Sequence, residues 1–521
     1  MTVAPKAALS PAEQRFDLAR RSLGRLAAPI VFVATLAIPW PGLEMPARCV
    51  AAIAAMTIVL WVTEAIPLAV SALLAPSLAV VLGVTDAKNA FAPFAHPLIF
   101  LFLGGFFLAE GLVAQGFDRR AALWLMSRRL VAGSPARAAI IVCCIAFGLS
   151  MWISNTATMA MMIPIVIGLC ATMERLCPAS SRTQMRHHGE GLIITLAYSA
   201  TLGGVCTPVG TAPNMIALGA LEDRLGVHID FLQWMSFAVP TSLVGLLAVL
   251  VVARRRFPSP VRQVSGLADY VRKEHGRLGP MSRGEVRSVV VFGLAIVGWI
   301  TPAVFRLGLG TDHAVTIWAR TGLKEGVVAL LCSSLLFILP GRSDPQDTRS
   351  PGTPRMLSWQ RAATIDWGTL LLLGGGLALG KLVFETGLAT AIGQGVLSLT
   401  EGVGTGSTRD ILVLVLSVAL VIYMTEVTSN TATTSMMLPV LISVAVAGGS
   451  NPLPLVLVVT MAASYAFMLP VSTPPNAIAY GTGHIRISAM IRFGWILDLF
   501  GLLLLVAAGL WFLPALPVAT L

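Results

Sequence analysis

The sequence predicts an all-α polytopic membrane protein, with about eleven transmembrane helices plus two re-entrant hairpins arranged in two inverted repeats. Three observations predict this fold: the composition, the lengths of the apolar runs and an internal repeat. Of the 521 residues, 56% are hydrophobic and only 12% are charged, and the mean hydropathy is +0.82. Because an ordinary soluble domain carries roughly 25% charged residues, a soluble enzyme is excluded.

The apolar runs set the number of predicted spans, because a membrane helix needs about 20 mostly apolar residues. The predicted spans are residues 27–44, 48–63, 66–84, 97–118, 190–206 with a continuation past 214, 232–252, 289–305, 323–339, 367–388, 454–469 with a continuation past 475, and 490–515. Two further stretches, 138–173 and 410–447, are too long for one crossing, and a Ser-Asn-Thr cluster interrupts each near its middle. We interpret each as a hairpin that enters and leaves on one membrane face.

Charge placement predicts the orientation. The net charge is +11, but the basic residues lie in short segments between apolar runs, so no nucleic-acid partner is expected. Lys and Arg gather on the cytoplasmic side of membrane proteins, which predicts a multi-pass protein of the cell (inner) membrane with a cytoplasmic N-terminus. The first hairpin then opens to the cytoplasm and the second to the outside. Segment 253–288 carries nine Lys or Arg against three acids and is interpreted as a solvated cytoplasmic linker, with a lipid- or partner-binding element as the alternative.

The internal repeat is the most informative feature. SNTATMAMMIPI (154–165) and SNTATTSMMLPV (429–440) are identical at eight of twelve positions. TPVGTAPN (207–214) matches LPVSTPPN (469–476), and LGGFFLAEGLVAQG (103–116) matches LGGGLALGKLVFETG (373–387). Five spans per repeat give the halves opposite orientations, and inverted repeats with broken helices are typical of secondary transporters.

The Ser-Asn-Thr clusters predict an ion-binding site at membrane depth. Non-helical backbone is tolerated there only where protein or a cavity satisfies it. The predicted helix breakers are Gly203, Gly204, Pro208, Gly210 and Pro213 in the first half, and Pro470, Pro474 and Pro475 in the second. Hydroxyl, amide and carbonyl oxygens suit Na⁺, and helix N-termini suit carboxylates. The alternative is that these hydroxyls are helix caps or packing groups.

These motifs, together with WVTEAIPLAVSALL (61–74), resemble the divalent anion/sodium symporter family, which carries dicarboxylates, citrate and sulfate. The similarity runs from about residue 50 to residue 515. The resemblance implies sodium-coupled symport of a C4-dicarboxylate (succinate, malate or fumarate) by an elevator-type alternating-access mechanism, in a homodimer and without enzymatic activity. Citrate or sulfate carriage, dicarboxylate exchange and proton coupling are the alternatives.

The resemblance also implies the site residues. One Na⁺ site would use Ser150, Ser154, Asn155 and the carbonyl of Gly210, and the other Thr425, Ser429, Asn430 and the carbonyl of Ser472. The substrate carboxylates would meet Asn155, Thr156, Thr211, Asn430, Thr431 and Thr473. Na⁺ is the only cofactor expected, as coupling ion, and the partners expected are a small dianionic substrate and the lipid bilayer.

The domain organisation follows from the same resemblance. It comprises a cytoplasmic N-terminal tail (1–26), scaffold helices (27–135 and 289–405), a transport domain in two halves (136–252 and 406–521) and the linker 253–288. Each transport half contains one re-entrant hairpin.

Five ionisable residues fall within predicted spans, where charged groups are candidates for function: Glu64, Glu110, Lys381, Glu385 and Glu426. Glu64 is interpreted as structural. Glu110 and Lys381 occupy nearly equivalent repeat positions, which makes a scaffold ion pair between them one hypothesis. Glu426, three residues before Ser429, either is a structural acid, which we favour, or titrates and gives proton coupling.

Two rival functions remain open from the residues alone. A sodium/proton antiporter or an arsenite exporter should carry titratable or soft ligands at the hairpin tips, whereas these tips carry neutral hydroxyls and amides. A membrane-embedded lipid transferase would need clustered acids, a group of His residues or a basic active-site loop, and the sequence offers no such pattern.

Overall fold

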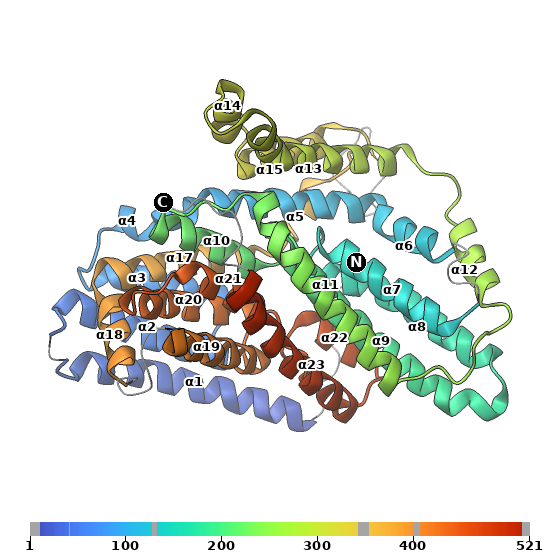
Figure 1. Ribbon diagram of the computed structural model, residues 1–521, viewed down its shortest axis with the longest axis horizontal. Helices are drawn as coiled ribbons and strands as arrows, with labels where there is room; N and C mark the ends of the chain where they lie inside the picture. The colour runs from blue at the N-terminus through green and yellow to red at the C-terminus, as the bar shows by residue number, and fades with distance from the viewer. Residues whose placement is uncertain (1–10, 41, 128–132, 342–353, 400–406, 513–521) are drawn as a thin grey trace.

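The computed structural model describes residues 11–40, 42–127, 133–341, 354–399 and 407–512, and these residues fold almost entirely into helices (Figure 1). Within those ranges, nine helices are long and apolar enough to cross a membrane, and ten are if the bent pair α14–α15 counts as one span. The prediction of an all-α polytopic membrane protein is confirmed.

The N-terminal helix begins earlier than the predicted first span. It starts at Pro11 and runs through the basic segment assigned to the tail, of which residues 1–10 lie outside the described residues. Arg20 forms an ion pair with Glu64 at 3.0 Å, and Arg25 donates to the carbonyl of Ala65 at 3.2 Å, so α1 is fastened along α2. The helices before the first hairpin are α1 (Pro11–Ala37), α2 (Met45–Thr63), α3 (Leu68–Val81), α4 (Ala87–Phe91), α5 (Pro97–Gln115) and α6 (Phe117–Ser127).

Both long apolar stretches break where the polar clusters were predicted to interrupt them. The first is α7 (Pro135–Ser150) followed by α8 (Asn155–Leu176), and the second is α19 (Ser407–Val427) followed by α20 (Asn430–Ala447). Since α8, α19 and α20 each satisfy the length requirement for a span, the return of each hairpin to one membrane face stays a prediction.

The remaining predicted spans include two that are interrupted. The helix after the first hairpin, α9, ends at Val205, and its continuation resumes at Ala212 after a short turn. The equivalent α21 ends at Ala462 and resumes at Pro474. The other elements are α9 (Arg182–Val205), η3 (Pro208–Gly210), α10 (Ala212–Leu225), α11 (Phe231–Arg256), α12 (Leu267–Gly276), α13 (Arg283–Leu309), α14 (Ala314–Gly322), α15 (Glu325–Ile338), α16 (Trp359–Ala362), α17 (Trp367–Glu385), α18 (Leu388–Leu399), α21 (Pro452–Ala462), α22 (Pro474–Gly481) and α23 (Ile487–Ala507). The second interruption leaves α21 with 11 residues, too few to qualify as a span.

In each half, the helix that follows the break packs on the hairpin of the other half. The helix after the first break, α10, packs on α20 of the second hairpin, and the helix after the second break, α22, packs on α8 of the first. The hydroxyl of Tyr198 on α9 also donates to the carbonyl of Phe467 in the second break. The two hairpins and the two breaks therefore belong to one packed body.

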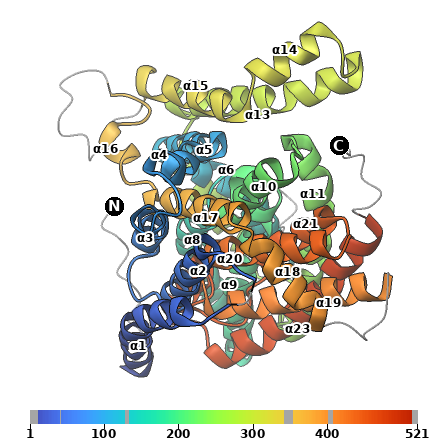
Figure 2. The same cartoon turned by 90° about the vertical axis from the view of Figure 1, so that its left-hand side faces the viewer.

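The outer helices lie at opposite edges of this body. Helices α13, α14 and α15 form one edge and cover α5, whereas α1 lies at the other edge beside α2 (Figures 1 and 2). A large apolar core that includes Trp234, Trp299, Tyr198 and Phe467 runs through the molecule between them. The arrangement encloses both broken helices within protein, which is the condition for non-helical backbone at membrane depth.

Candidate cation and anion site

The first hairpin tip brings two predicted cation ligands into contact. Ser150 is the last residue of α7 and fully buried, and Asn155 is the first residue of α8. The Ser150 hydroxyl donates to Asn155 Oδ1 at 2.7 Å. Ser154 caps α8, its Oγ accepting from the Ala157 N–H at 3.2 Å. The tip therefore presents neutral oxygens at a helix N-terminus, where exposed N–H groups carry partial positive charge.

The first break lies directly against this tip. A Cβ placed on Gly204 would lie 2.1 Å from Asn155 Oδ1, and one on Gly210 would lie 2.3 Å from the Gly204 carbonyl oxygen. The Thr207 hydroxyl donates to the Met151 carbonyl at 2.5 Å, joining break and tip. Three of the four predicted ligand residues, Ser150, Asn155 and Gly210, are thus linked through Gly204. Gly203 and Gly204 both lie inside α9, so our interpretation of them as helix breakers is wrong. Gly204 instead permits close approach of the amide.

The second tip repeats this construction. The Thr425 hydroxyl is fully buried and lies 2.7 Å from Asn430 Oδ1 and 2.7 Å from the Ala463 carbonyl oxygen. Asn430 is the first residue of α20, and Ser429 is its N-cap without a side-chain hydrogen bond. The pairs Ser150–Asn155 and Thr425–Asn430 therefore share the same sequence separation and the same oxygen–oxygen distance. In each pair the asparagine is the first residue of a helix.

Two buried asparagines, which the sequence argument did not include in the site, hold the broken backbone in both halves. Asn214 donates to the carbonyls of Gly204 at 3.2 Å and Thr207 at 2.7 Å. Asn476 donates to the carbonyls of Ala466 at 2.9 Å and Leu469 at 3.1 Å. Ala466 lies 262 positions after Gly204, and Leu469 lies 262 positions after Thr207. The same number of positions separates Asn476 from Asn214, so the two sets of hydrogen bonds occupy equivalent positions in the repeat. The shared Pro-Asn and Pro-Pro-Asn endings of the matched segments were the signal for this role.

Glu426 organises the second break. It is 2% exposed and accepts hydrogen bonds from the backbone N–H groups of Met468 at 2.8 Å and Leu469 at 3.0 Å, and from the Ser472 hydroxyl at 2.6 Å. The Ser472 hydroxyl is engaged in this way, and the predicted cation ligand at this residue is its carbonyl. These contacts favour the structural interpretation of Glu426 over a titrating one.

The predicted anion ligands differ in accessibility. Thr156 is exposed and Thr211 and Thr431 are half-buried, whereas Thr473 is 3% exposed. The Thr473 hydroxyl accepts from the Asn476 N–H at 3.3 Å, so it acts as the cap of α22 in this conformation. No hydrogen bond between described residues joins Asn155 to Asn430. The exchanged packing of α10 and α22 links the two sets of ligands instead.

The predicted candidates Glu110, Lys381 and Glu385 have local partners. Glu110 pairs with Arg361 at 2.5 Å, and Lys381 lies 3.8 Å from Glu385 on its own helix, so the hypothesis of a Glu110–Lys381 pair is wrong. One helical turn separates Lys381 from Glu385, which is the ordinary geometry of a local pair. Among the described residues, no group of three or more His, Cys, Asp or Glu side chains could hold a metal ion.

Replacing Glu426 by Gln tests its structural role. A Gln side chain offers one acceptor and one donor where three donors now converge, so about 1–3 kcal/mol of stability should be lost. We expect a lower melting temperature for the detergent-solubilised protein and an uptake pH profile of unchanged shape. The matched control is Glu385→Gln, which removes an exposed acid on α17. A flattened pH profile in Glu426→Gln at unchanged melting temperature would instead identify a titrating group.

Comparison with known proteins places the chain in a family. Residues 19–518 match the family described as the sodium:sulfate symporter transmembrane region. The chain is similar to the sodium-dependent dicarboxylate transporter SdcS of Staphylococcus saprophyticus, with 34% identity over 497 residues that cover 94% of this chain and 91% of the relative. The SdcS of Staphylococcus aureus is 32% identical over 503 residues, with the same shares covered.

The fold also has a likeness among solved structures. A crystal structure of the Alcanivorax borkumensis YdaH transporter aligns with a TM-score of 0.57 at 12% identity, over 96% of this chain and 98% of that one. This likeness concerns the fold alone. The family match and the SdcS relatives together cover almost the whole chain, broken helices included, and the chain is therefore a carrier that belongs to the divalent anion/sodium symporter family.

Proposed function

We propose that this chain is a secondary active transporter that couples the movement of Na⁺ to that of a C4-dicarboxylate such as succinate, malate or fumarate. The observation that carries the proposal is the pair of matched neutral clusters, Ser150–Asn155 and Thr425–Asn430, each with an oxygen–oxygen distance of 2.7 Å. The printed names of the SdcS relatives support both the cation and the class of anion.

The donor set of each cluster fits Na⁺. The first site consists of Ser150, Ser154, Asn155 and the Gly210 carbonyl, and the second of Thr425, Ser429, Asn430 and the Ser472 carbonyl. Hydroxyl, amide and carbonyl oxygens are hard ligands that suit a hard cation. At the starts of α10 and α22, beside these clusters, the buried Oδ1 atoms of Asn214 and Asn476 accept no hydrogen bond from described residues, which makes both surroundings electronegative.

The anion site uses the starts of four helices. Asn155 and Thr156 begin α8, Asn430 and Thr431 begin α20, and Thr211 and Thr473 are the N-caps of α10 and α22. Helix N-termini favour carboxylates through their free N–H groups and their dipoles.

Coupling follows from the desolvation cost of the substrate. Two carboxylates cannot enter a partly apolar site cheaply without cations. Bound Na⁺ offsets their charge and orders the tips, so the dicarboxylate binds well only after the cations. Because binding free energies are reciprocal, the substrate strengthens Na⁺ binding by the same factor.

Alternating access is proposed to occur by an elevator-type movement. The transport domain, 136–252 with 406–521, moves as a loaded unit against the scaffold helices of 27–135 and 289–405. The packing of α10 against the second hairpin and of α22 against the first supports a single moving body. The basic loops support a cytoplasmic N-terminus in the inner membrane, and a homodimer is proposed from the family resemblance.

A competition panel in proteoliposomes tests the substrate class. Unlabelled succinate, malate, fumarate, citrate and sulfate compete against labelled succinate at saturating Na⁺. We expect the three C4-dicarboxylates to compete most strongly, because the proposed site offers four helix starts and six polar side chains to two carboxylates. Competition by sulfate or citrate alone would contradict the dicarboxylate assignment. A dependence on a proton gradient in place of Na⁺ would contradict the symport mechanism.

A further inference from the structure

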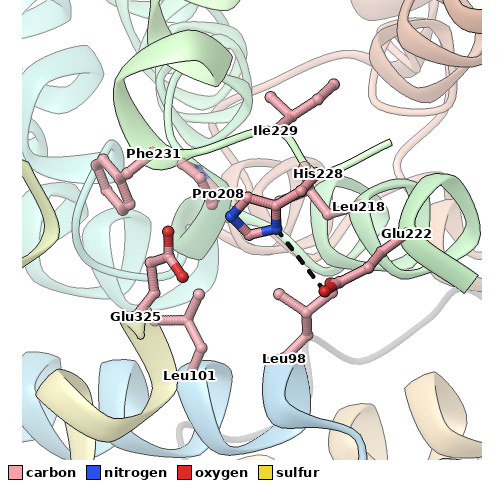
Figure 3. Close-up of a pocket in the computed structure, with 9 residues that line it drawn as sticks. All are labelled: Leu98, Leu101, Pro208, Leu218, Glu222, His228, Ile229, Phe231 and Glu325. Atoms are coloured by element: carbon pink, nitrogen blue, oxygen red, sulfur yellow. Dashed lines mark ion pairs between the residues drawn. The ribbon is translucent and has the colours of Figure 1, made fainter. Parts of the chain in front are cut away.

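The 222–230 turn, which comprises the end of α10 and its connection to α11, is rich in charged residues and lies against four scaffold helices. A small pocket at this place is lined from the transport side by Glu222, His228 and Phe231, and from the scaffold side by Leu98, Leu101 and Glu325 (Figure 3). Its free volume is about 20 Å³, room for little more than one water molecule. The pocket is too small for a ligand, and its charged residues lie on both sides of the boundary.

Two ion pairs cross from this turn to the scaffold. His96 at the start of α5 lies 3.4 Å from Asp223 at the end of α10. Arg306 on α13 lies 2.8 Å from Asp230, the N-cap of α11, and their side chains are only 28% and 12% exposed. Partly buried pairs are screened less by salt than exposed ones, so the Arg306–Asp230 pair holds more firmly than a surface pair.

Two further contacts reinforce the same boundary. The ring of His228 lies between Glu222, at 3.8 Å, and Glu325 of α15 on the opposite wall (Figure 3). The Arg224 guanidinium stands 5.0 Å from the ring centroid of Phe384 on α17, a cation–π distance. The turn thus reaches the scaffold helices α5, α13, α15 and α17.

The other ion pairs that the structure describes do not cross this boundary. Arg361–Glu110 joins scaffold elements, and Arg486–Glu190 at 2.8 Å joins the two halves of the transport domain. Arg120–Glu285 at 2.7 Å joins α6 to the start of α13. Within the described ranges, ionic contact between the two proposed domains is therefore concentrated on one turn.

We propose that the 222–230 turn is an ionic latch, in which Asp223 and Asp230 are positioning residues that hold the transport domain against the scaffold in the conformation described here. The proposal rests on the proposed elevator movement, because a sliding transport domain carries the turn away from α5, α13 and α15. Each crossing to the other conformation breaks the His96–Asp223 and Arg306–Asp230 pairs. The latch thereby sets how long the carrier stays in this conformation.

The test measures the latched population directly. Leu98 on α5 and Leu218 on α10 both line the pocket, so cysteines at these positions report contact between the domains. They are introduced into a background whose seven native cysteines are replaced, and Hg²⁺ cross-linking is followed over time in the full-length protein. Asp230→Asn keeps the N-cap but removes the charge, and Arg306→Gln removes its partner.

We expect either substitution to slow cross-linking about fivefold, the factor that corresponds to a partly buried pair worth about 1 kcal/mol. The double variant should be no slower than either single one, since both remove the same interaction. The matched control is Arg320→Gln, which removes an exposed charge on α14. Unchanged cross-linking in Asp230→Asn and Arg306→Gln would overturn the latch, and so would additive effects in the double variant.

Transport by the cross-linked carrier separates the latch from the proposed function. Cross-linked protein should lose uptake, and a thiol reductant should restore it. Full uptake by cross-linked protein would show that the turn does not move, which overturns the latch but leaves symport intact. If the uncross-linked parent transports no dicarboxylate while its cross-linking still responds to Asp230→Asn, the proposed function fails and the ionic contact stands.

His228 adds a pH readout. The Glu222 carboxylate, which accepts from the His228 ring, raises the pKa of His228 above its usual value, burial opposes this, and the carboxylates of Glu325 and Asp230 add to the rise. The other charged or titratable groups at this place are Asp223, His96, Lys324, Arg224 and Arg306. A raised histidine pKa means that the contact is strongest below that pKa and weakens as pH rises through it. Cross-linking should therefore slow with rising pH in the parent and slow less in His228→Asn, which keeps the His96–Asp223 contact. An equal pH dependence in both would contradict the role of His228.

Discussion

Replacing Asn155 or Asn430 by Ala should each, alone, abolish sodium-driven uptake of succinate. Each amide accepts from the hydroxyl one turn before it and stands at the first position of a helix, where it is proposed to serve both a cation and the anion. Loss of one hydrogen-bonding group to an ion costs about 1.5–3 kcal/mol, or roughly tenfold to a hundredfold in affinity. Because each residue serves two bound species, the losses compound through coupling.

The measurement is initial uptake into proteoliposomes as a function of Na⁺ and succinate concentration. The matched control is Asn451→Ala, which removes an exposed helix N-cap on α21 away from the tips and should leave uptake near its normal value. We expect both variants to lose uptake, although 275 positions separate the two asparagines in the sequence, because both residues serve one site. Normal uptake by either variant would mean that the two tips do not form one site.

Adding a single methyl group at Gly204 should be almost as damaging. A Cβ there would lie 2.1 Å from Asn155 Oδ1 and 2.9 Å from its Cγ, so the amide must move off its place at the tip. We expect Gly204→Ala to reduce apparent Na⁺ affinity at least about tenfold, because the displaced oxygen is a proposed cation ligand.

Gly148 provides the matched control in the same region. It lies in α7, two residues before Ser150, and a Cβ there meets no atom within 4 Å. Gly148→Ala should keep normal Na⁺ affinity, and the better helix propensity of Ala favours its folding by about 1 kcal/mol. Equal Na⁺ affinities in the two variants would contradict the position of Asn155 against the first break.

The parts of the fold that the sequence predicted well are those with a strong local signal. Ser154-Asn155-Thr156 and Ser429-Asn430-Thr431 interrupt otherwise continuous apolar runs, so the tips of both hairpins were predicted at the correct positions. The start of α1 was not predicted correctly. The first half of this helix is amphipathic and is held by contacts of Arg20 and Arg25, whereas its composition alone is like that of a solvated tail.

Contacts between distant segments were beyond the sequence argument. Glu110 and Lys381 have matching repeat positions but different partners, since pairing depends on the neighbouring helix and not on the register. The backbone bonds of Asn214 and Asn476 and the close approach of Gly204 depend on how the breaks fold against the tips. The His96–Asp223 and Arg306–Asp230 pairs join residues with no shared motif, so nothing in the pattern predicted them.

The central claim is that neutral oxygen clusters require Na⁺ before they accept a dicarboxylate. It is tested most directly by initial uptake of labelled succinate into proteoliposomes with an inward Na⁺ gradient, compared with the same vesicles in which choline replaces Na⁺. The account predicts concentrative uptake with Na⁺ and uptake at the level of empty liposomes with choline. Equal uptake in the two conditions would contradict it.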